Sequence, residues 1–104
     1  MLTVIESPFF LNKTAEFLDD QTRQEFIDWI ATNPLAGDLI KGTGGLRKVR
    51  WALPGRGKSG GMRVVTYYLK PDGEIWLLVA YTKAKFDNLP TDFLLALKKE
   101  LFDV

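Results

Sequence analysis

Six basic side chains gather in the stretch 46–63, LRKVRWALPGRGKSGGMR, which contains no acidic residue. They are Arg47, Lys48, Arg50, Arg56, Lys58 and Arg63. The wider window 39–71 holds eight basic residues and again no Asp or Glu, although the whole chain has 14 basic and 13 acidic residues. Such segregation of charge is typical of a surface that binds a polyanion.

The residue types in this stretch allow RNA to be cut as well as bound. Cleavage requires removal of the 2′-hydroxyl proton, stabilisation of charge on the crowded phosphorus, and a proton for the leaving 5′-oxygen. The chain has no histidine and no cysteine, so we expect lysine and tyrosine to transfer protons, without a metal or cofactor. Arginine stays charged and can bind phosphate through two N–H groups. The residues alone favour binding over cleavage.

Three strands are predicted to position these side chains. Alternation over Leu46–Leu53 puts Lys48 and Arg50 on one face of the first strand. Met62–Leu69 and Glu74–Thr82 follow as two further strands, with short connections that make all three antiparallel.

The free face of this sheet is predicted to carry cations and tyrosines. Its expected members are Lys48, Arg50, Arg63, Tyr67, Tyr81 and Lys83, with Arg56 and Lys58 in the Gly-rich loop at the rim. Phosphates bind to cations and exposed bases stack on aromatic rings, so RNA or a single strand is the expected ligand.

The elements before the basic stretch are predicted to be a strand and two helices. Leu2–Glu6 is a short β-branched run, and Ser7 caps a helix that begins at Pro8. This helix is predicted to present Phe10, Leu11, Phe17 and Leu18 on one face. A second helix is predicted from the capping-box spacing of Thr22 and Glu25, and it ends at Asn33-Pro34.

Two further segments have competing interpretations. The run Gly42–Gly45 is predicted to be a turn rather than a phosphate cradle, because it does not lead from a strand into a helix. The last helix runs from Pro90 or Thr91 to Phe102, with Phe93, Leu94, Leu97 and Leu101 in one stripe. Leu95 and Phe102 fall on another side, which indicates either a partner surface or the flank of the same core.

The predicted fold is α+β, with the order β-α-α-β-β-β-α and an antiparallel sheet that has its helices packed on one face. The chain of 104 residues fits a single domain, 1–104. No apolar run approaches the ~20 residues that span a bilayer, and the first residues lack the basic region of a signal peptide. A cytoplasmic protein without a membrane partner is the prediction.

The segment 42–69, GTGGLRKVRWALPGRGKSGGMRVVTYYL, followed by Tyr81-Thr82-Lys83, resembles HigB-like toxins of the RelE/ParE superfamily. This likeness runs through nearly the whole chain. It implies the toxin of a type II toxin–antitoxin system, with a RelE-like fold and a ribosome-dependent mRNA endoribonuclease activity that inhibits translation. The implied partners are the ribosome, mRNA and a cognate antitoxin, whose helix-turn-helix domain brings the complex to operator DNA.

The resemblance also implies roles for individual residues. Arg63 stabilises the transition state, Lys48 and Arg50 contact phosphate and assist proton transfer, and Lys83 matches the lysine after the last strand. Residues expected to contact RNA or the ribosome are Arg47, Arg56, Lys58, Tyr67, Tyr81 and Lys85. The general acid and base stay open, because Ala84-Lys85 replaces the family's Asn-Glu and the C-terminal tyrosine of the RelE branch has no counterpart.

Two alternatives belong to other functional classes. One is a ParE-type inhibitor of DNA gyrase, which acts by protein contact and does not need cations arranged for phosphate. The other is a non-catalytic RNA-binding module.

Overall fold

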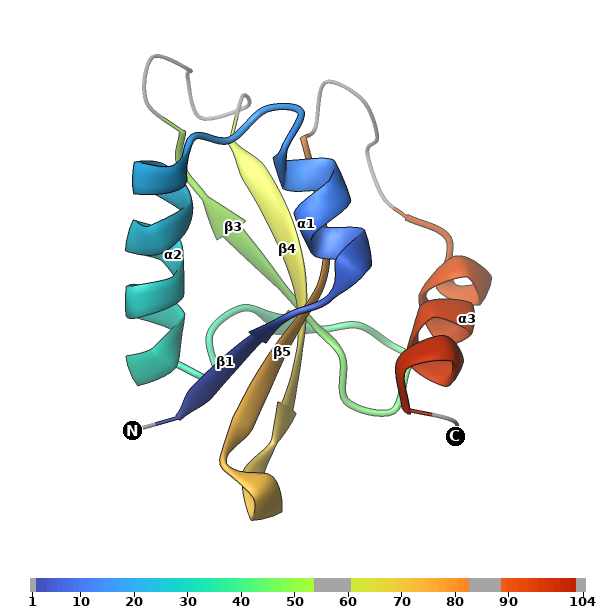
Figure 1. The fold of residues 1–104 in the computed structure, drawn as a ribbon. Coiled ribbons are helices and arrows are strands. Elements are labelled where there is room, and N and C mark those ends of the chain that lie inside the picture. Colours follow the sequence, from blue (N-terminus) through green and yellow to red (C-terminus); the bar gives the residue numbers. More distant parts are fainter. Residues whose placement is uncertain (1, 54–60, 83–88, 103–104) are drawn as a thin grey trace.

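The computed structural model describes residues 2–53, 61–82 and 89–102 (Figure 1). Its elements are β1 (Thr3–Glu6), α1 (Pro8–Thr14), α2 (Asp20–Thr32), β2 (Asp38–Leu39), β3 (Arg47–Trp51), β4 (Met62–Leu69), the 3-10 turn η2 (Lys70–Asp72), β5 (Glu74–Thr82) and α3 (Thr91–Phe102). The predicted α+β class is confirmed, and β4 and β5 have the bounds expected from their alternation and from the turn between them.

The strands form one sheet in the order β1-β5-β4-β3-β2. β2, β3, β4 and β5 pair antiparallel, whereas β1 pairs parallel to β5. The sheet is therefore mixed, and the prediction of a purely antiparallel sheet was wrong for β1. The reason is that α1 and α2 separate β1 from the hairpins, so no tight turn fixes its direction.

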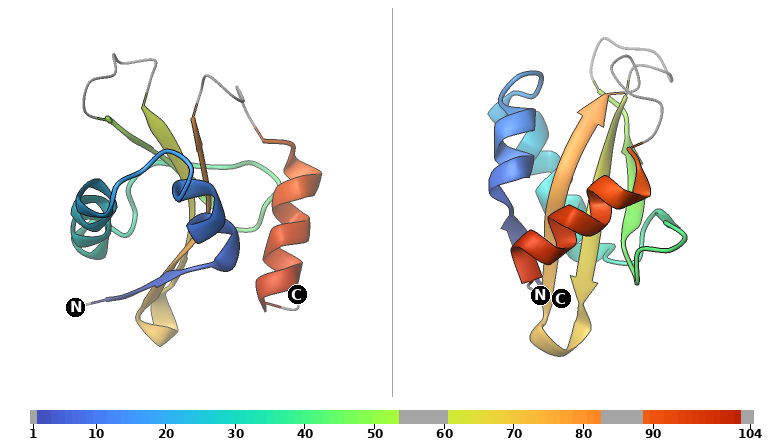
Figure 2. Two further views of the ribbon diagram at one scale, coloured as in Figure 1. Left: turned by 45° about the horizontal axis from the view of Figure 1, so that its top comes forward. Right: turned by 90° about the vertical axis from the view of Figure 1, so that its right-hand side faces the viewer.

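Helices pack on both faces of the sheet. The face that bears Val49 and Val64 is covered by α1 and α2, as predicted. The third helix departs from the prediction, because Leu94 and Leu97 of α3 pack with residues of opposite parity, including Val65. Figure 2 shows α1 and α2 together on one side of the strands, with α3 separate from them. We call these the α1/α2 face and the basic face.

Ser7 caps α1 as predicted. Its Oγ accepts a hydrogen bond from the N–H of Phe10 at 3.1 Å and donates to the carbonyl of Leu78 at 2.6 Å, which ties α1 to β5. The helix ends at Thr14, so the predicted continuous face through residue 18 was wrong. Phe10 is buried and Leu11 is 41% exposed, while Phe17 and Leu18 pack on the core from beyond the helix.

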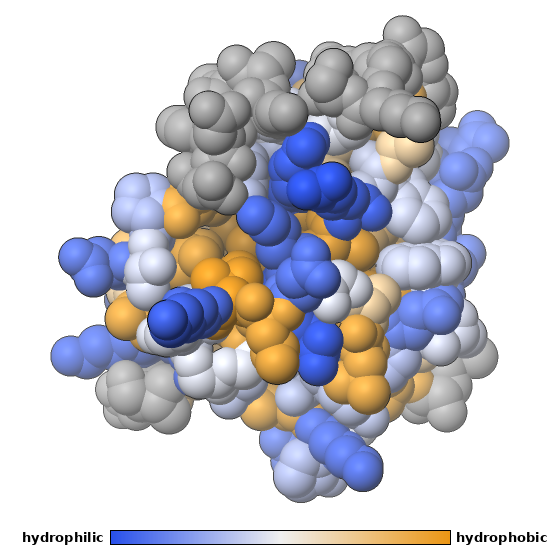
Figure 3. Space-filling view, turned by 180° about the vertical axis from the view of Figure 1, so that it is seen from behind, coloured by the Kyte–Doolittle hydropathy of each residue, from blue (hydrophilic) through white to orange (hydrophobic). Residues whose placement is uncertain are grey.

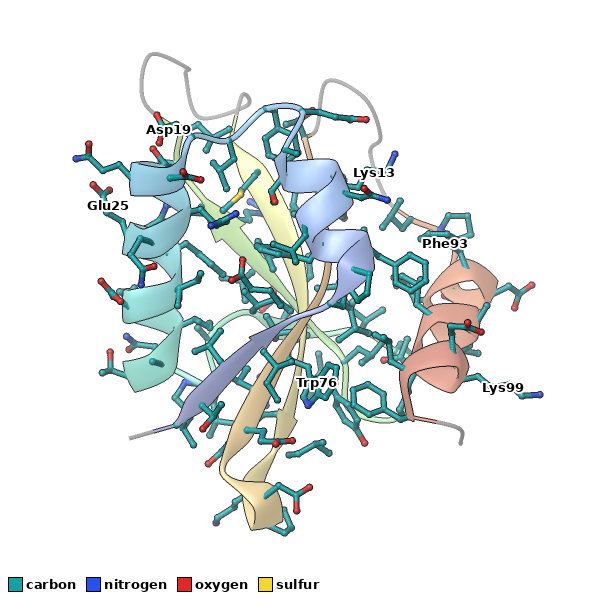
Figure 4. The ribbon with its side chains drawn as sticks, viewed as in Figure 1. Lys13, Asp19, Glu25, Trp76, Phe93 and Lys99 are labelled. Carbon is teal, nitrogen blue, oxygen red and sulfur yellow. The ribbon has the colours of Figure 1, made fainter. Side chains whose placement is uncertain are left out.

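Asp19 caps α2, and the predicted capping box at Thr22 and Glu25 was wrong. The Oδ1 atom of Asp19 accepts a hydrogen bond from the N–H of Thr22 at 2.7 Å. Because this carboxylate precedes Thr22, the helix starts a turn earlier and buries Thr22 inside its first turn. Glu25 points outward from α2 (Figure 4). The predicted end at Asn33 is confirmed.

The turn at Gly42–Gly45 receives a lysine from α3. The Nζ atom of Lys98 donates to the carbonyl oxygens of Thr43 at 3.0 Å and Gly44 at 3.2 Å. Gly44 has a φ of +69°, a left-handed conformation that favours glycine at this position. The segment is a turn, as predicted, and it presents carbonyl oxygens to a cation.

Phe102 belongs to the core on the basic face. Its ring packs edge-on against Tyr67 and Trp76, with centroids 5.1 and 4.9 Å apart. Leu95 and Phe93 stay 40% and 44% exposed. The flanking interpretation is thus correct for Phe102 and does not apply to Leu95. Within the described ranges, no helix is long and apolar enough to cross a membrane.

Candidate functional site

The strand register brings Arg50, Arg63 and Tyr81 side by side. Arg50 of β3 lies opposite Arg63 of β4, and Arg63 lies opposite Tyr81 of β5. Directly opposed residues in an antiparallel pair have Cα atoms about 4.5–5.5 Å apart and share a face. These three residues form a continuous row across the basic face, which we call the arginine row.

Lys48 lies next to this row on the same face. It is two residues from Arg50 along β3, opposite Val65, and it is half-buried. Figure 3 shows the molecule from behind, where strongly hydrophilic side chains run down the centre with apolar surface on both sides. The four residues therefore provide a strip of positive charge with a tyrosine at one end.

The two arginines of the row have different environments. Arg50 is exposed, whereas Arg63 is only 8% exposed. Nη1 of Arg63 donates to the carbonyl oxygen of Gly61 at 3.1 Å. Both arginines line a hollow of about 270 Å³, together with Trp51, Ala52, Gly61 and Met62. The site therefore combines a fixed, buried guanidinium with a second one in contact with solvent.

Tyr81 is 5% exposed. Burial raises the pKa of its hydroxyl above 10.0, and the positive charge of Arg63 acts in the opposite direction. Tyr81 is therefore a neutral phenol near pH 7, which can donate a proton or a hydrogen bond and is a poor base.

Arg47 does not lie on the basic face, and its expected contact with RNA or the ribosome stays a prediction. It shares the parity of Val49 on the α1/α2 face. Its Nη1 donates to the carbonyl oxygens of Leu35 and Gly37, each at 3.2 Å. The guanidinium holds the 35–37 segment against the sheet.

Tyr67 lies on the basic face as predicted and packs against α3, while its expected contact with RNA stays a prediction. The ring of Phe102 meets it edge-on, and Nζ of Lys98 lies 4.9 Å from its centroid. The side chains of α3 therefore occupy the surroundings that a stacked base would need.

Four predicted site residues, Arg56, Lys58, Lys83 and Lys85, lie outside the described residues. Among the residues that are described, no group of three His, Cys, Asp or Glu side chains is arranged to hold a metal ion. The sequence interpretation missed Gly61, whose carbonyl fixes Arg63. The Gly60-Gly61 pair just before Arg63 was the signal.

No family model matches this chain. Among solved structures, the E. coli toxin RelE in the free state, in a mutant with two arginines changed to alanine, is similar to it with a TM-score of 0.58. The identity is 11%, and the match covers 83% of this chain and 87% of that one. At this identity the comparison shows the fold alone. The predicted RelE-like fold is confirmed, and the finer likeness to HigB stays a prediction.

Proposed function

We propose that this protein is the toxin of a type II toxin–antitoxin pair and that it cleaves mRNA on the ribosome. The observation that carries the proposal is the arginine row, in which Arg50, Arg63 and Tyr81 meet on adjacent strands. The RelE-like fold supports it, because the similar solved structure is that of a toxin. The finer assignment to the HigB-like branch rests on the GTGGLRK and GRGK motifs of the sequence.

The arginine row suits the charge that develops when RNA is cut. Attack of the 2′-oxygen on phosphorus forms one P–O bond and breaks the bond to the 5′-oxygen. Negative charge grows on the non-bridging oxygens, and fixed guanidinium groups stabilise it without reorganising. In our proposal exposed Arg50 captures the phosphate, and Arg63, held by Gly61, stabilises the transition state.

Two proton transfers complete the reaction. Because Tyr81 is protonated at neutral pH and lies beside Arg63, we assign it as the candidate donor to the leaving 5′-oxygen. Lys48, beside the row on the same face, is the described candidate to contact the phosphate and assist removal of the 2′-hydroxyl proton. Lys83 is a second candidate for the same step and lies outside the described residues.

The proposal also names binding partners and a cellular compartment. A cognate antitoxin with a helix-turn-helix domain would neutralise the toxin and bring the complex to operator DNA. Ribosomal RNA would bind Arg56, Lys58 and Lys85, and the single domain 1–104 would act in the cytoplasm. Residues 1–38 carry seven acids and two bases, and among them Asp19 and Glu25 are exposed on the side of α2 (Figure 4). This charge separation would orient the basic face towards a polyanion.

The test is to induce the protein and map the 5′ ends of a translated message with and without a block to translation. We expect growth arrest and new 5′ ends that vanish when translation is blocked. Arg63→Ala should lower the cleavage rate by about 10²–10³-fold, the effect of losing one group that stabilises an oxyanion. Full toxicity of a folded Arg63→Ala protein would refute the site.

Two other outcomes would replace the proposal. Arrested DNA replication with intact mRNA would support a gyrase inhibitor. RNA binding without growth arrest would support a non-catalytic binding module.

A further inference from the structure

Gly61, the residue before β4, is buried against the end of β3. A Cβ atom at this position would lie 2.7 Å from the carbonyl oxygen of Trp51 and 3.6 Å from Cα of Ala52. Both neighbours are backbone atoms, which cannot rotate away as a flexible side chain can. Close approach of the two backbones therefore requires a residue without a side chain.

The carbonyl of Gly61 is also the acceptor for the Arg63 guanidinium. A guanidinium is a rigid plane with five N–H groups in fixed directions. A hydrogen bond from one Nη to a carbonyl therefore restricts the directions in which the remaining donors can point. Arg63 is 8% exposed, so protein atoms rather than water decide where these donors point.

The hydrogen bond also opposes a repulsion within the arginine row. Arg50 and Arg63 lie directly opposite each other, and like charges in that arrangement push apart. Neither of them has an ion pair with an acidic side chain of the described residues. The Gly61 carbonyl therefore holds Arg63 in a place that its nearest charged neighbour disfavours.

We propose that Gly61 is a positioning residue, which keeps the Arg63 guanidinium directed at the phosphate site. Its effect on RNA cleavage rests on the proposed function. The position of the guanidinium is a property of the free protein and can be measured without RNA.

The test uses Tyr81 as an internal reporter of that position. Burial raises the pKa of Tyr81 and the Arg63 charge lowers it, so moving the charge away should raise the pKa further. The experiment is an NMR titration of the protein with ¹³Cζ-labelled tyrosine, in the wild type, Gly61→Ala and Arg63→Gln. We expect both variants to raise the pKa of Tyr81 and leave the resonances of Tyr67 in place.

Gly73→Ala is the matched control for destabilisation alone. Gly73 has open space around a Cβ atom but a φ of +64°, so alanine strains the turn far from the arginine row. This variant should lose stability and leave the pKa of Tyr81 unchanged. Gly61→Ala should instead lower mRNA cleavage by about 10²-fold, the cost of a displacement near 1 Å at a reacting centre.

A second measurement covers the case in which Gly61→Ala does not fold. In the wild-type protein, the Nη protons of Arg63 should give separate NMR signals with hindered rotation, and those of exposed Arg50 should be averaged. Averaged Arg63 signals, or an unchanged Tyr81 pKa in folded Gly61→Ala, would overturn the inference. If the Tyr81 pKa rises as expected and the wild type cuts no mRNA, the positioning role stands and the proposed function falls.

Discussion

The arginines of β3 differ between the two faces of the sheet in their exposure and hydrogen bonding. On the α1/α2 face, Arg47 donates to the carbonyls of Leu35 and Gly37 and holds a loop. On the basic face, Arg50, three residues further along β3, is exposed beside Arg63. The two arginines of β3 therefore differ in environment, because strand alternation places residues 47 and 50 on opposite faces of the sheet.

The difference between the two faces indicates which residues stabilise the fold and which are available to bind a ligand. The α1/α2 face is closed by a continuous apolar cluster that includes Phe10, Phe26 and Ile30, all fully buried. The basic face is closed by α3 over part of its area, and its two opposed arginines lack acidic partners among the described residues. Unopposed charge is unfavourable for folding, so we expect mutations on the α1/α2 face to affect stability and those in the arginine row to affect activity.

The largest expected effect is the loss of stability in Phe26→Ala. Phe26 is fully buried, with its ring edge-on to Trp51 at 5.2 Å and tilted to Trp29 at 6.3 Å. Removing a buried aromatic ring costs about 3–5 kcal/mol of unfolding free energy. Urea unfolding should report this loss. The matched control is Phe93→Ala on α3, since Phe93 is 44% exposed and should change stability by about 1 kcal/mol or less. Equal losses of unfolding free energy in Phe26→Ala and Phe93→Ala would contradict the expected difference between the two faces.

The second prediction compares the alanine variants of the two β3 arginines. Arg50→Ala should lower mRNA cleavage by about 10²-fold and change stability by less than about 0.5 kcal/mol, because Arg50 is exposed. Arg47→Ala should keep the activity of the folded protein and lose about 1 kcal/mol, since its two hydrogen bonds lie at the surface. Cleavage assays on purified ribosomes and urea unfolding check both. Loss of activity in Arg47→Ala with stability unchanged would contradict the assignment of the faces.

Local patterns predicted most of the fold and only part of the site. The bounds of β4 and β5 followed from alternation and from the turn at Lys70–Asp72, because both signals depend on residues close in sequence. The cap of α2 was predicted at Thr22 and lies at Asp19, three residues earlier. The direction of β1 depends on a long connection and was predicted wrongly.

The site required information that no local pattern carries. Parity placed Lys48 and Arg50 on one face, but only the register shows that Arg50, Arg63 and Tyr81 are aligned. The packing of Tyr67 depends on Lys98 and Phe102 of α3, which are distant in sequence. The sequence therefore could not show which side chains of the sheet are covered by a helix from elsewhere in the chain.

The third prediction tests how α3 is held on the basic face. Lys98→Ala removes two hydrogen bonds to the Gly42–Gly45 turn and the contact with the Tyr67 ring. We expect a loss of about 1–2 kcal/mol, because Lys98 is half-buried and charged hydrogen bonds are stronger than neutral ones. Lys99→Ala is the control, since Lys99 points away from the molecule (Figure 4). If both variants unfold at the wild-type urea concentration, α3 is held by its apolar contacts alone.

The smallest expected effect lies at the acidic end of the pH range, on the α1/α2 face. The hydrogen bond from the backbone N–H of Thr22, with a further contribution from its side chain, lowers the pKa of Asp19 below 3.8. A carboxylate with a depressed pKa in the folded state stabilises the protein fully above its unfolded pKa, and this stabilisation is lost as the pH falls through the folded value. Stability of the wild type should therefore decline below about pH 3.8 through this group, starting with the first turn of α2.

Asp19→Asn isolates that contribution, because asparagine keeps an acceptor oxygen for the Thr22 N–H and does not titrate. The stability difference between wild type and Asp19→Asn should be constant above pH 5 and shrink below about pH 3.8. Hydrogen exchange of the first-turn amides of α2, followed across this range, should show the same change, with the amides of β4 unaffected until global unfolding. Parallel pH curves for the two proteins would show that the cap does not titrate with folding. In that case the apolar cluster would stabilise the α1/α2 face without a contribution from the Asp19 charge. The two faces would then differ even more clearly.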